Sequence, residues 1–190
     1  MRQATFEDKN TVVDILVRSF EDNRSVNYII AQGRARQKSL EGLMQYSFDY
    51  CQLFGKVLLS DDEKACALLV YPDKKKTSLK SIALDVKLAF GAVGIQRIKR
   101  ALRRESIINA LHPNPEICYL WFIGVTPSDQ NQGKGSRLLD QIVQENKNLN
   151  REIFLETSAE KNIPFYRKFG FQIYKELDFG YRLYCLKKAS

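Results

Sequence analysis

The chain has 190 residues, of which 44% are hydrophobic and 11% aromatic, and its formal net charge is +8. This size suits one domain, or one domain with an insert, and the composition suffices for a sizeable core. No apolar run is longer than a few residues, and the first residues lack the apolar stretch of a leader. We therefore expect neither a membrane span nor a secretory signal, and we place the protein in the cytoplasm.

The positive charge is concentrated in one stretch. Residues 73–104 hold ten Lys and Arg against Asp73 and Asp85, a surplus equal to the net charge of the whole chain. Such a stretch can be a solvated helix face, can help to attract an anionic cofactor, or can bind nucleic acid. Because no aromatic residue lies between Arg97 and Arg104 and no nucleic-acid motif is present, the solvated face is favoured and nucleic acid is not an expected partner.

The four cysteines are far apart and lack the spacing of a metal or redox site. We expect Cys51, Cys66, Cys118 and Cys185 to be reduced thiols, most of them buried. No cluster with metal-ligand spacing occurs elsewhere in the chain, so no metal is expected.

The first half of the chain predicts a short strand, two helices and a hairpin. Residues 2–5 suit a strand, and Thr5 to Asp8 resemble a capping box that opens a helix. Residues 34–54 predict a second helix, which Gly55 ends. Residues 56–60 and 65–71 are expected to pair as antiparallel strands around a polar turn.

Residues 77–111 predict a helical insert. The apolar residues from Leu79 to Val93 recur every three or four positions, and Gly91 and Gly94 interrupt the pattern, so two helices are expected. We expect this insert to cover the acceptor side of a ligand cleft near Trp121 and Tyr166, and a packing embellishment is the alternative.

The second half alternates strands and helices. Strands are expected at residues 117–125, 153–157, 172–175 and 181–187, with helices at 133–145 and 162–169. Because a helix connects the first two of these strands, they should be parallel. The predicted fold is a single α/β domain over residues 1–190 with a mixed sheet.

A glycine-rich turn precedes the helix at residues 133–145. Gln130, Gly133 and Gly135 form a Q-x-x-G-x-G run, and the free N–H groups at a helix start attract phosphate. The run is not a P-loop, because Gly135 rather than Ser or Thr follows Lys134. It is not a dinucleotide loop either, because Leu138 replaces the third glycine. A different phosphate-bearing ligand is indicated, with an ordinary strand–turn–helix as the alternative.

A second motif narrows the choice. Asn162, Tyr166 and the pair Gly170-Phe171 follow the strand at residues 153–157. With the glycine run, these residues resemble the GNAT superfamily of acyl-CoA-dependent N-acyltransferases. Residues 119–173 are similar to one antibiotic-modifying member in particular. One departure is Asn131, at a position that is commonly Gly, although Asn tolerates positive φ better than most residues.

The resemblance implies a fold and a cofactor site. It implies a mixed sheet whose central parallel strands splay apart, with acetyl-CoA as co-substrate between them. Gly124 would suit a bulge in the first of these strands, and close packing is the alternative. The implied cofactor contacts are Ile123, Val125, Gln130, Asn131, Gln132, Gly133, Lys134, Gly135, Ser136 and Asn162, with the pyrophosphate on the N–H groups from Gln132 to Ser136.

The catalytic expectations combine the resemblance with side-chain chemistry. The resemblance makes Tyr166 the acid that protonates the departing thiolate. Glu156 is a candidate base, or else a structural carboxylate. Trp121 lines the acceptor pocket or belongs to the core. His112 has no partner in the sequence and reads as a loop residue, so no nucleophile pair for a covalent acyl-enzyme is evident.

The sequence thus predicts an acetyl-CoA-dependent N-acetyltransferase that acts directly on a primary amine of a small molecule. A protein amine as acceptor, or a non-catalytic acyl-CoA sensor, stays open. No membrane partner is expected, and homodimer formation is left open.

Overall fold

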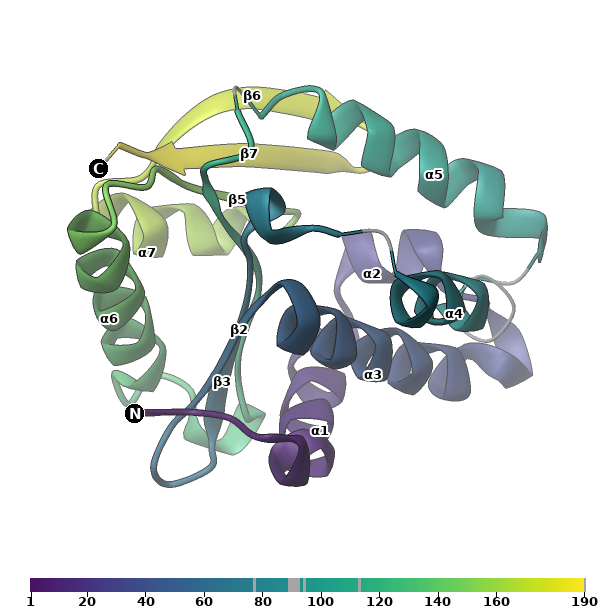
Figure 1. The fold of residues 1–190 in the computed structure, drawn as a ribbon, viewed down its shortest axis with the longest axis horizontal. Helices are drawn as coiled ribbons and strands as arrows, with labels where there is room; N and C mark the ends of the chain where they lie inside the picture. Colours follow the sequence, from purple (N-terminus) through teal and green to yellow (C-terminus); the bar gives the residue numbers. More distant parts are fainter. Residues whose placement is uncertain (77, 89–92, 94, 113, 190) are drawn as a thin grey trace.

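The computed structural model describes residues 1–76, 78–88, 93, 95–112 and 114–189. Its strands form one seven-stranded mixed sheet in the order β1-β2-β3-β4-β5-β7-β6 (Figure 1). The strands are β1 (Arg2–Gln3), β2 (Gly55–Leu59), β3 (Ala65–Val70), β4 (Cys118–Val125), β5 (Ile153–Thr157), β6 (Gln172–Asp178) and β7 (Arg182–Lys188). The predicted mixed α/β architecture is confirmed.

Helices cover both faces of the sheet. In chain order they are α1 (Lys9–Phe20), α2 (Arg24–Ile29), α3 (Arg36–Phe54), α4 (Leu79–Leu88), α5 (Ile95–Asn109), α6 (Lys134–Asn148) and α7 (Ile163–Lys168). α1 and α3 pack on one face of the sheet, and α6 and α7 pack on the other. None of these helices is long and apolar enough to cross a membrane.

The sheet opens at its centre. β4 and β5 are the parallel pair, but their register comprises only Cys118 opposite Ile153 and Tyr119 opposite Phe154. β4 continues to Val125 and β5 to Thr157. The two strands therefore separate beyond Tyr119, and no strand among the described residues pairs with the rest of β4 on that side.

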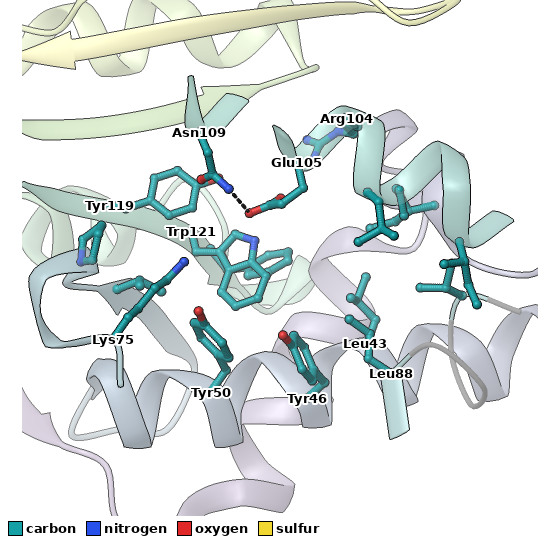
Figure 2. A pocket seen from close by; sticks show the side chains of 18 of the residues that line it. Leu43, Tyr46, Tyr50, Lys75, Leu88, Arg104, Glu105, Asn109, Tyr119 and Trp121 are labelled. Carbon is teal, nitrogen blue, oxygen red and sulfur yellow. Dashed lines mark hydrogen bonds between the residues drawn. The ribbon is translucent and has the colours of Figure 1, made fainter. Parts of the chain in front are cut away.

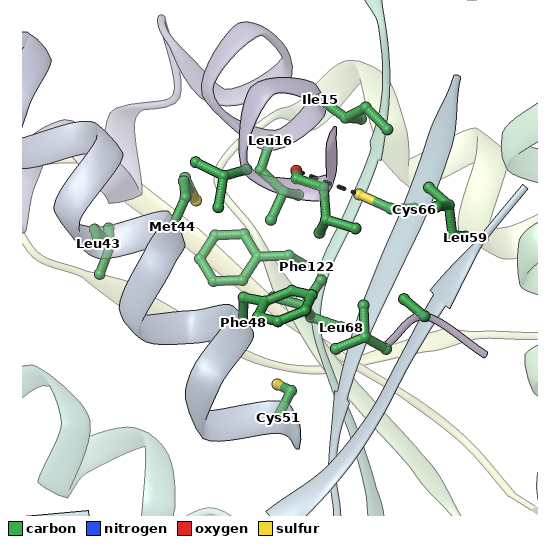
Figure 3. Close-up of a cluster of buried hydrophobic side chains, with 14 of the residues drawn as sticks. Ile15, Leu16, Leu43, Met44, Phe48, Cys51, Leu59, Cys66, Leu68 and Phe122 are labelled. Atoms are coloured by element: carbon green, nitrogen blue, oxygen red, sulfur yellow. Dashed lines mark hydrogen bonds between the residues drawn. The ribbon is translucent and has the colours of Figure 1, made fainter. Parts of the chain in front are cut away.

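A bulge in β4 lies at Trp121. Leu69 of β3 is opposite Leu120, and the next residue of β3, Leu68, is opposite Phe122, so Trp121 is one residue more than β3 supplies. Trp121 and Phe122 consequently share a face: Trp121 turns toward the tyrosines of α3 (Figure 2) and Phe122 enters the core beside Phe48 (Figure 3).

The expected bulge at Gly124 is wrong. A Cβ on Gly124 would lie 3.0 Å from the Ser19 side-chain oxygen and 3.3 Å from a methyl carbon of Leu16. The close approach of α1 to β4 requires the glycine, which is the packing alternative considered for this position.

The sequence predicted most of the other elements. The hairpin, the long helix that ends at Phe54, the crossover helix and the paired helices of residues 77–111 are confirmed, while Phe90, Gly91 and Gly94 lie outside the described residues. The initial capping box opens a short 3₁₀ turn, in which Thr5 N–H donates to the Asp8 carboxylate at 2.7 Å, and α1 follows. The sequence pattern missed α2, which Asn23 caps by accepting from Val26 N–H at 3.1 Å.

Candidate active site

A cleft of about 1060 Å³ lies where β4 and β5 separate. Its walls are the end of β4, the glycine-rich loop, the first turn of α6, the end of α1 and the residues around α7. Of the predicted cofactor contacts, the cleft gathers Ile123, Val125, Gln130, Asn131, Gly133, Lys134, Gly135, Ser136 and Asn162. The exception is Gln132, whose side-chain amide donates to Ser128 O at 3.4 Å.

The loop takes the shape that an anion site requires. Asn131 and Gly133 have φ of 62° and 76°, which bears out the expectation that Asn131 tolerates a glycine position. The first backbone bond of the helix runs from Arg137 N–H to Gly133 O at 3.0 Å. The N–H groups of residues 134–136 therefore precede the helical ladder and are available to a ligand.

The side chain of Lys134 is engaged elsewhere. Its ammonium group contacts Asp62 and lies 3.4 Å from an oxygen of Asp129. These carboxylates neutralise much of its charge at the edge of the cleft. Lys134 can therefore offer a ligand mainly its backbone N–H, as the glycine run predicts.

The open edge of β4 presents backbone groups to the cleft. Thr126 N–H donates to Lys64 O at 2.9 Å, so Thr126 faces the β3 side of the sheet. Because residues of an antiparallel strand alternate in this respect, Ile123 and Val125 turn their N–H and C=O groups the other way, toward the separation. Accordingly, Val125 O accepts from Ser19 Oγ at 2.9 Å and from Gln130 Nε2 at 3.3 Å on that side.

Tyr166 lines the same cleft from α7. It lies one helical turn after Asn162, which also lines the cleft, and its ring packs edge-on against Phe171 at 5.9 Å. Only 6% of Tyr166 is exposed. Burial raises the pKa of Tyr166 above its usual value, so its hydroxyl keeps its proton at neutral pH.

A second cavity, of about 360 Å³, lies on the opposite face of the sheet. Its walls are α3, the helices α4 and α5, and the first half of β4 (Figure 2). Trp121 lines this cavity, while Tyr166 belongs to the cluster on the α6 face. The expectation that one site holds Trp121 and Tyr166 together under the insert is therefore wrong, because the sheet separates them.

The cavity and the cleft approach each other at β4. Phe122 lines the cavity and the next residue, Ile123, lines the cleft. Phe20, on the cleft side, packs edge-to-face on Phe122 with ring centroids 5.1 Å apart. The contact between Phe20 and Phe122 therefore lies between the cleft and the cavity.

Glu156 is buried at the point where the strands part. The Tyr119 hydroxyl donates to Glu156 Oε2 at 2.5 Å and joins β4 to β5. Burial, and next the Glu156 charge, raise the pKa of Tyr119 well above its usual value, so the phenol remains protonated. Tyr119 lines the cavity whereas Glu156 lies behind it, so any proton that passes from the cavity to Glu156 meets the Tyr119 hydroxyl first.

His112 is buried next to Glu156, which is unlike an ordinary loop residue. Its side chain is only 8% exposed, and its Nε2 atom lies 3.8 Å from Glu156 Oε1. Neither of these two buried atoms has a hydrogen-bond partner among the described residues. No sequence pattern signals this proximity, because a loop residue and a strand residue 44 positions apart meet only through the fold.

The basic stretch divides into exposed and buried parts. Lys99, Arg100 and Arg103 are exposed on α5, as the solvated-face interpretation requires. Arg104 instead turns inward, donating to Tyr181 Oη at 3.0 Å and Ser25 Oγ at 2.7 Å. Arg104 thereby ties the insert to the β6–β7 hairpin and to α2.

Comparison with known proteins identifies a family that matches part of the chain. Residues 85–173, which run from α4 into β6, match the family described as acetyltransferase (GNAT) domain. The predicted resemblance to the GNAT superfamily is thereby confirmed. The match covers just under half of the chain, including the glycine-rich loop, Glu156 and Tyr166, and leaves α1, α2 and α3 outside.

Several solved structures share the fold over almost the whole chain. A histone acetyltransferase HPA2 and related acetyltransferase from Corynebacterium glutamicum is similar with a TM-score of 0.71, 18% identity, and 99% and 94% coverage of this chain and of that one. The C-terminal condensation domain of Ebony, in complex with beta-alanyl-dopamine, is similar with a TM-score of 0.69 and 10% identity; the match covers 100% of this chain and 97% of that one. Arylalkylamine N-acetyltransferase 2 from Aedes aegypti is similar with a TM-score of 0.64 and 13% identity; the match covers 99% of this chain and 97% of that one.

These TM-scores establish a common fold, and acyl transfer is the chemistry that the matched family supports. The closer similarity of residues 119–173 to puromycin N-acetyltransferase, suggested by the order of their residues, stays a prediction. The second cavity is built partly from α3, which lies outside the family match.

Proposed function

We propose that this protein is an acetyl-CoA-dependent N-acetyltransferase that transfers the acetyl group directly to a primary amine of a small molecule. The observation that carries the proposal is the separation of β4 from β5, with the phosphate-binding type of loop at its mouth and a second cavity across the bulge. In this arrangement the thioester binds in the cleft and the amine binds in the cavity, and both lie beside β4.

The residues of the cleft fit the co-substrate. The pyrophosphate is held by backbone N–H groups between Gln132 and Ser136, where the glycine run lets the chain approach a ligand closely. Ile123 and Val125 hold the pantetheine arm with the backbone groups that they turn toward the separation, much as a third strand would. The Ile123 N–H is the donor closest to the bulge and polarises the thioester carbonyl.

Tyr119 and Glu156 remove the proton of the amine. As the new C–N bond forms, an amine proton moves to the Tyr119 oxygen, and the proton of Tyr119 moves to Glu156 Oε2, 2.5 Å away. The high pKa of Tyr119 makes a free tyrosinate costly, so both transfers occur together. Glu156 is thus the base, and Tyr119 is the group that touches the substrate.

Tyr166 completes the reaction at the sulfur. When the C–S bond breaks, its electron pair stays on the sulfur, and the Tyr166 hydroxyl supplies the proton. Solvent then returns the proton from Glu156 to Tyr166, which restores the enzyme. Ping-pong kinetics through an acyl-enzyme are not expected, because all four cysteines are buried and the pKa of each thiol is raised by burial.

The cavity favours a small acceptor over a protein. Residues of α4 and α5 line it opposite α3, and a volume of about 360 Å³ lies at the small end of ligand pockets. A lysine side chain or an N-terminus on a folded protein would need an open groove to reach the bulge.

A thiol-release assay with acetyl-CoA and a panel of primary amines tests the proposal. We expect amine-dependent release of coenzyme A and an N-acetylated product by mass spectrometry. Acetyl-CoA binding by calorimetry without turnover of any amine would instead support the sensor. Turnover only with peptides would support a protein substrate.

A further inference from the structure

The acceptor cavity is lined by a group of aromatic side chains at the edge of the core. Tyr46 and Tyr50, one turn apart on α3, meet Trp121 of β4 edge-on, with ring centroids 6.1 Å and 5.6 Å from the indole (Figure 2). All three line the cavity and are only half-buried. We name Tyr46, Tyr50 and Trp121 the aromatic cradle.

The remaining walls are mostly apolar. Leu43 lies on α3 with the cradle tyrosines, and Leu88, Ile98 and Leu102 line the cavity from the helical insert. A flat apolar group placed here would contact ring faces and edges on several sides, which is the arrangement that aromatic ligands prefer.

The charges on the walls disfavour a polycation. Lys75 and Arg104 both line the cavity, and the Lys75 ammonium lies 5.5 Å from the centre of the Tyr50 ring. The facing carboxylate, Glu105, accepts from the Asn109 side chain at 3.4 Å. Two cations against one carboxylate repel a ligand with several ammonium groups.

The reactive end of the cavity is set by β4. Tyr119 and Trp121 lie two residues apart on the same face, which spaces their attachment points by about 7 Å. Tyr119 is the residue that reaches Glu156 where the strands part. An aromatic ring on the cradle with its amine one or two carbons away could therefore extend the nitrogen toward Tyr119.

We infer that the acceptor is an aromatic monoamine, an amine carried on a short alkyl arm from one or two rings, and that the aromatic cradle selects it. This inference rests on the proposed acetyltransferase function. Selection comes from ring contacts at Tyr46, Tyr50 and Trp121, together with rejection of polyamines by Lys75 and Arg104.

Turnover of matched amines tests the inference. Phenethylamine and tyramine are compared with hexylamine, spermidine and a lysine-containing peptide at a fixed acetyl-CoA concentration. We expect kcat/KM to be about tenfold or more higher for the aromatic amines. Trp121→Leu or Tyr50→Leu should remove most of that ratio while leaving acetyl-CoA affinity unchanged. Phe6→Leu, a change of a ring that is 65% exposed outside both sites, should keep the ratio.

Binding provides a readout that does not need turnover. Trp121 is the only tryptophan of the chain, so intrinsic fluorescence reports directly on the cradle. Phenethylamine should change it saturably, and hexylamine should do so only at much higher concentration. Equal response to both amines, or faster turnover of spermidine, overturns the inference while an active enzyme still supports the proposed function. Saturable phenethylamine binding without any acetylation supports the cradle and overturns the proposed function.

Discussion

The hydrogen bond between Tyr119 and Glu156 gives the sharpest test of the proposed chemistry. Tyr119→Phe removes only the hydroxyl, and Glu156→Gln removes the negative charge while keeping an oxygen that can accept from Tyr119. One variant therefore removes the proton relay and the other removes the base, and neither creates a cavity.

The magnitudes follow from burial. Glu156 is 4% exposed at its side chain, Tyr119 is the hydrogen-bond donor to its Oε2, and its Oε1 has no hydrogen bond among the described residues. Tyr119→Phe thus leaves a buried carboxylate without that donor, which costs about 2 kcal/mol of unfolding free energy. For a chain of this size the midpoint of thermal unfolding should fall by roughly 4–8 °C. Adding Glu156→Gln should recover part of this loss, because the unpaired charge is gone.

Activity should respond differently from stability. Both single variants should lower kcat by about 10²–10⁴-fold, and the double variant should be no more active than either single one. The affinity for acetyl-CoA should stay unchanged, because neither residue lines the cleft. The three readouts are kcat at saturating amine, acetyl-CoA affinity by calorimetry, and the midpoint of thermal unfolding.

Tyr174→Phe is the matched control. The Tyr174 hydroxyl is also buried, but it has no hydrogen-bond partner among the described residues. Its removal should be neutral or stabilising and should not affect kcat. If Tyr119→Phe behaves like Tyr174→Phe in both stability and turnover, the relay through Tyr119 is refuted.

Three further predictions concern the cleft and the core. Tyr166→Phe keeps the packed ring and removes the acid, so kcat should fall about 10²–10⁴-fold with acetyl-CoA affinity nearly unchanged; wild-type kcat, with chemistry limiting the rate, would return Tyr166 to a packing role. Gly133→Val strains a backbone at φ 76° and should abolish acetyl-CoA binding in calorimetry, whereas Gly33→Val, at φ 72° outside the cleft, should bind normally; equal affinities would contradict the loop assignment. Burial raises the pKa of Cys118 to about 12, so the folded chain keeps a proton that the unfolded chain loses above about pH 9, and the free energy of unfolding should fall as pH rises from 9 toward 12, by up to about 1.4 kcal/mol per pH unit. Urea unfolding at pH 8 and pH 10 measures this slope, and Cys118→Ala should reduce it; an unchanged slope would show that the thiol does not contribute.

The cofactor half could be predicted because its chemistry is local. A glycine run at a helix start and a tyrosine four residues after an asparagine are readable in one stretch of chain, and the fold brings Gly133, Gly135, Asn162 and Tyr166 to one cleft. Parallel pairing of β4 and β5 followed from the crossover helix between them.

The acceptor half could not be predicted in the same way. Tyr50 meets Trp121, and His112 meets Tyr119 and Glu156, only through the packing of α3, β4, β5 and a loop, and no spacing in the sequence records such contacts. The position of the bulge was predicted wrongly because glycine often occurs at bulges and Gly124 lies in the strand. Nothing in the sequence around Trp121 indicates that β4 has an extra residue there. Propensity also concealed α2, whose six residues depend on the Asn23 cap.

The extra residue at Trp121 makes the length of β4 as important as its composition. It shifts the alternation of the strand by one place, so that Gly124 rather than Val125 meets α1. A regular β4 of the same length, without the bulge, would instead turn Val125 to the spot where even a Cβ lies 3.0 Å from Ser19. The bulge and Gly124 are therefore matched to each other, because the extra residue brings a glycine rather than a branched side chain against α1.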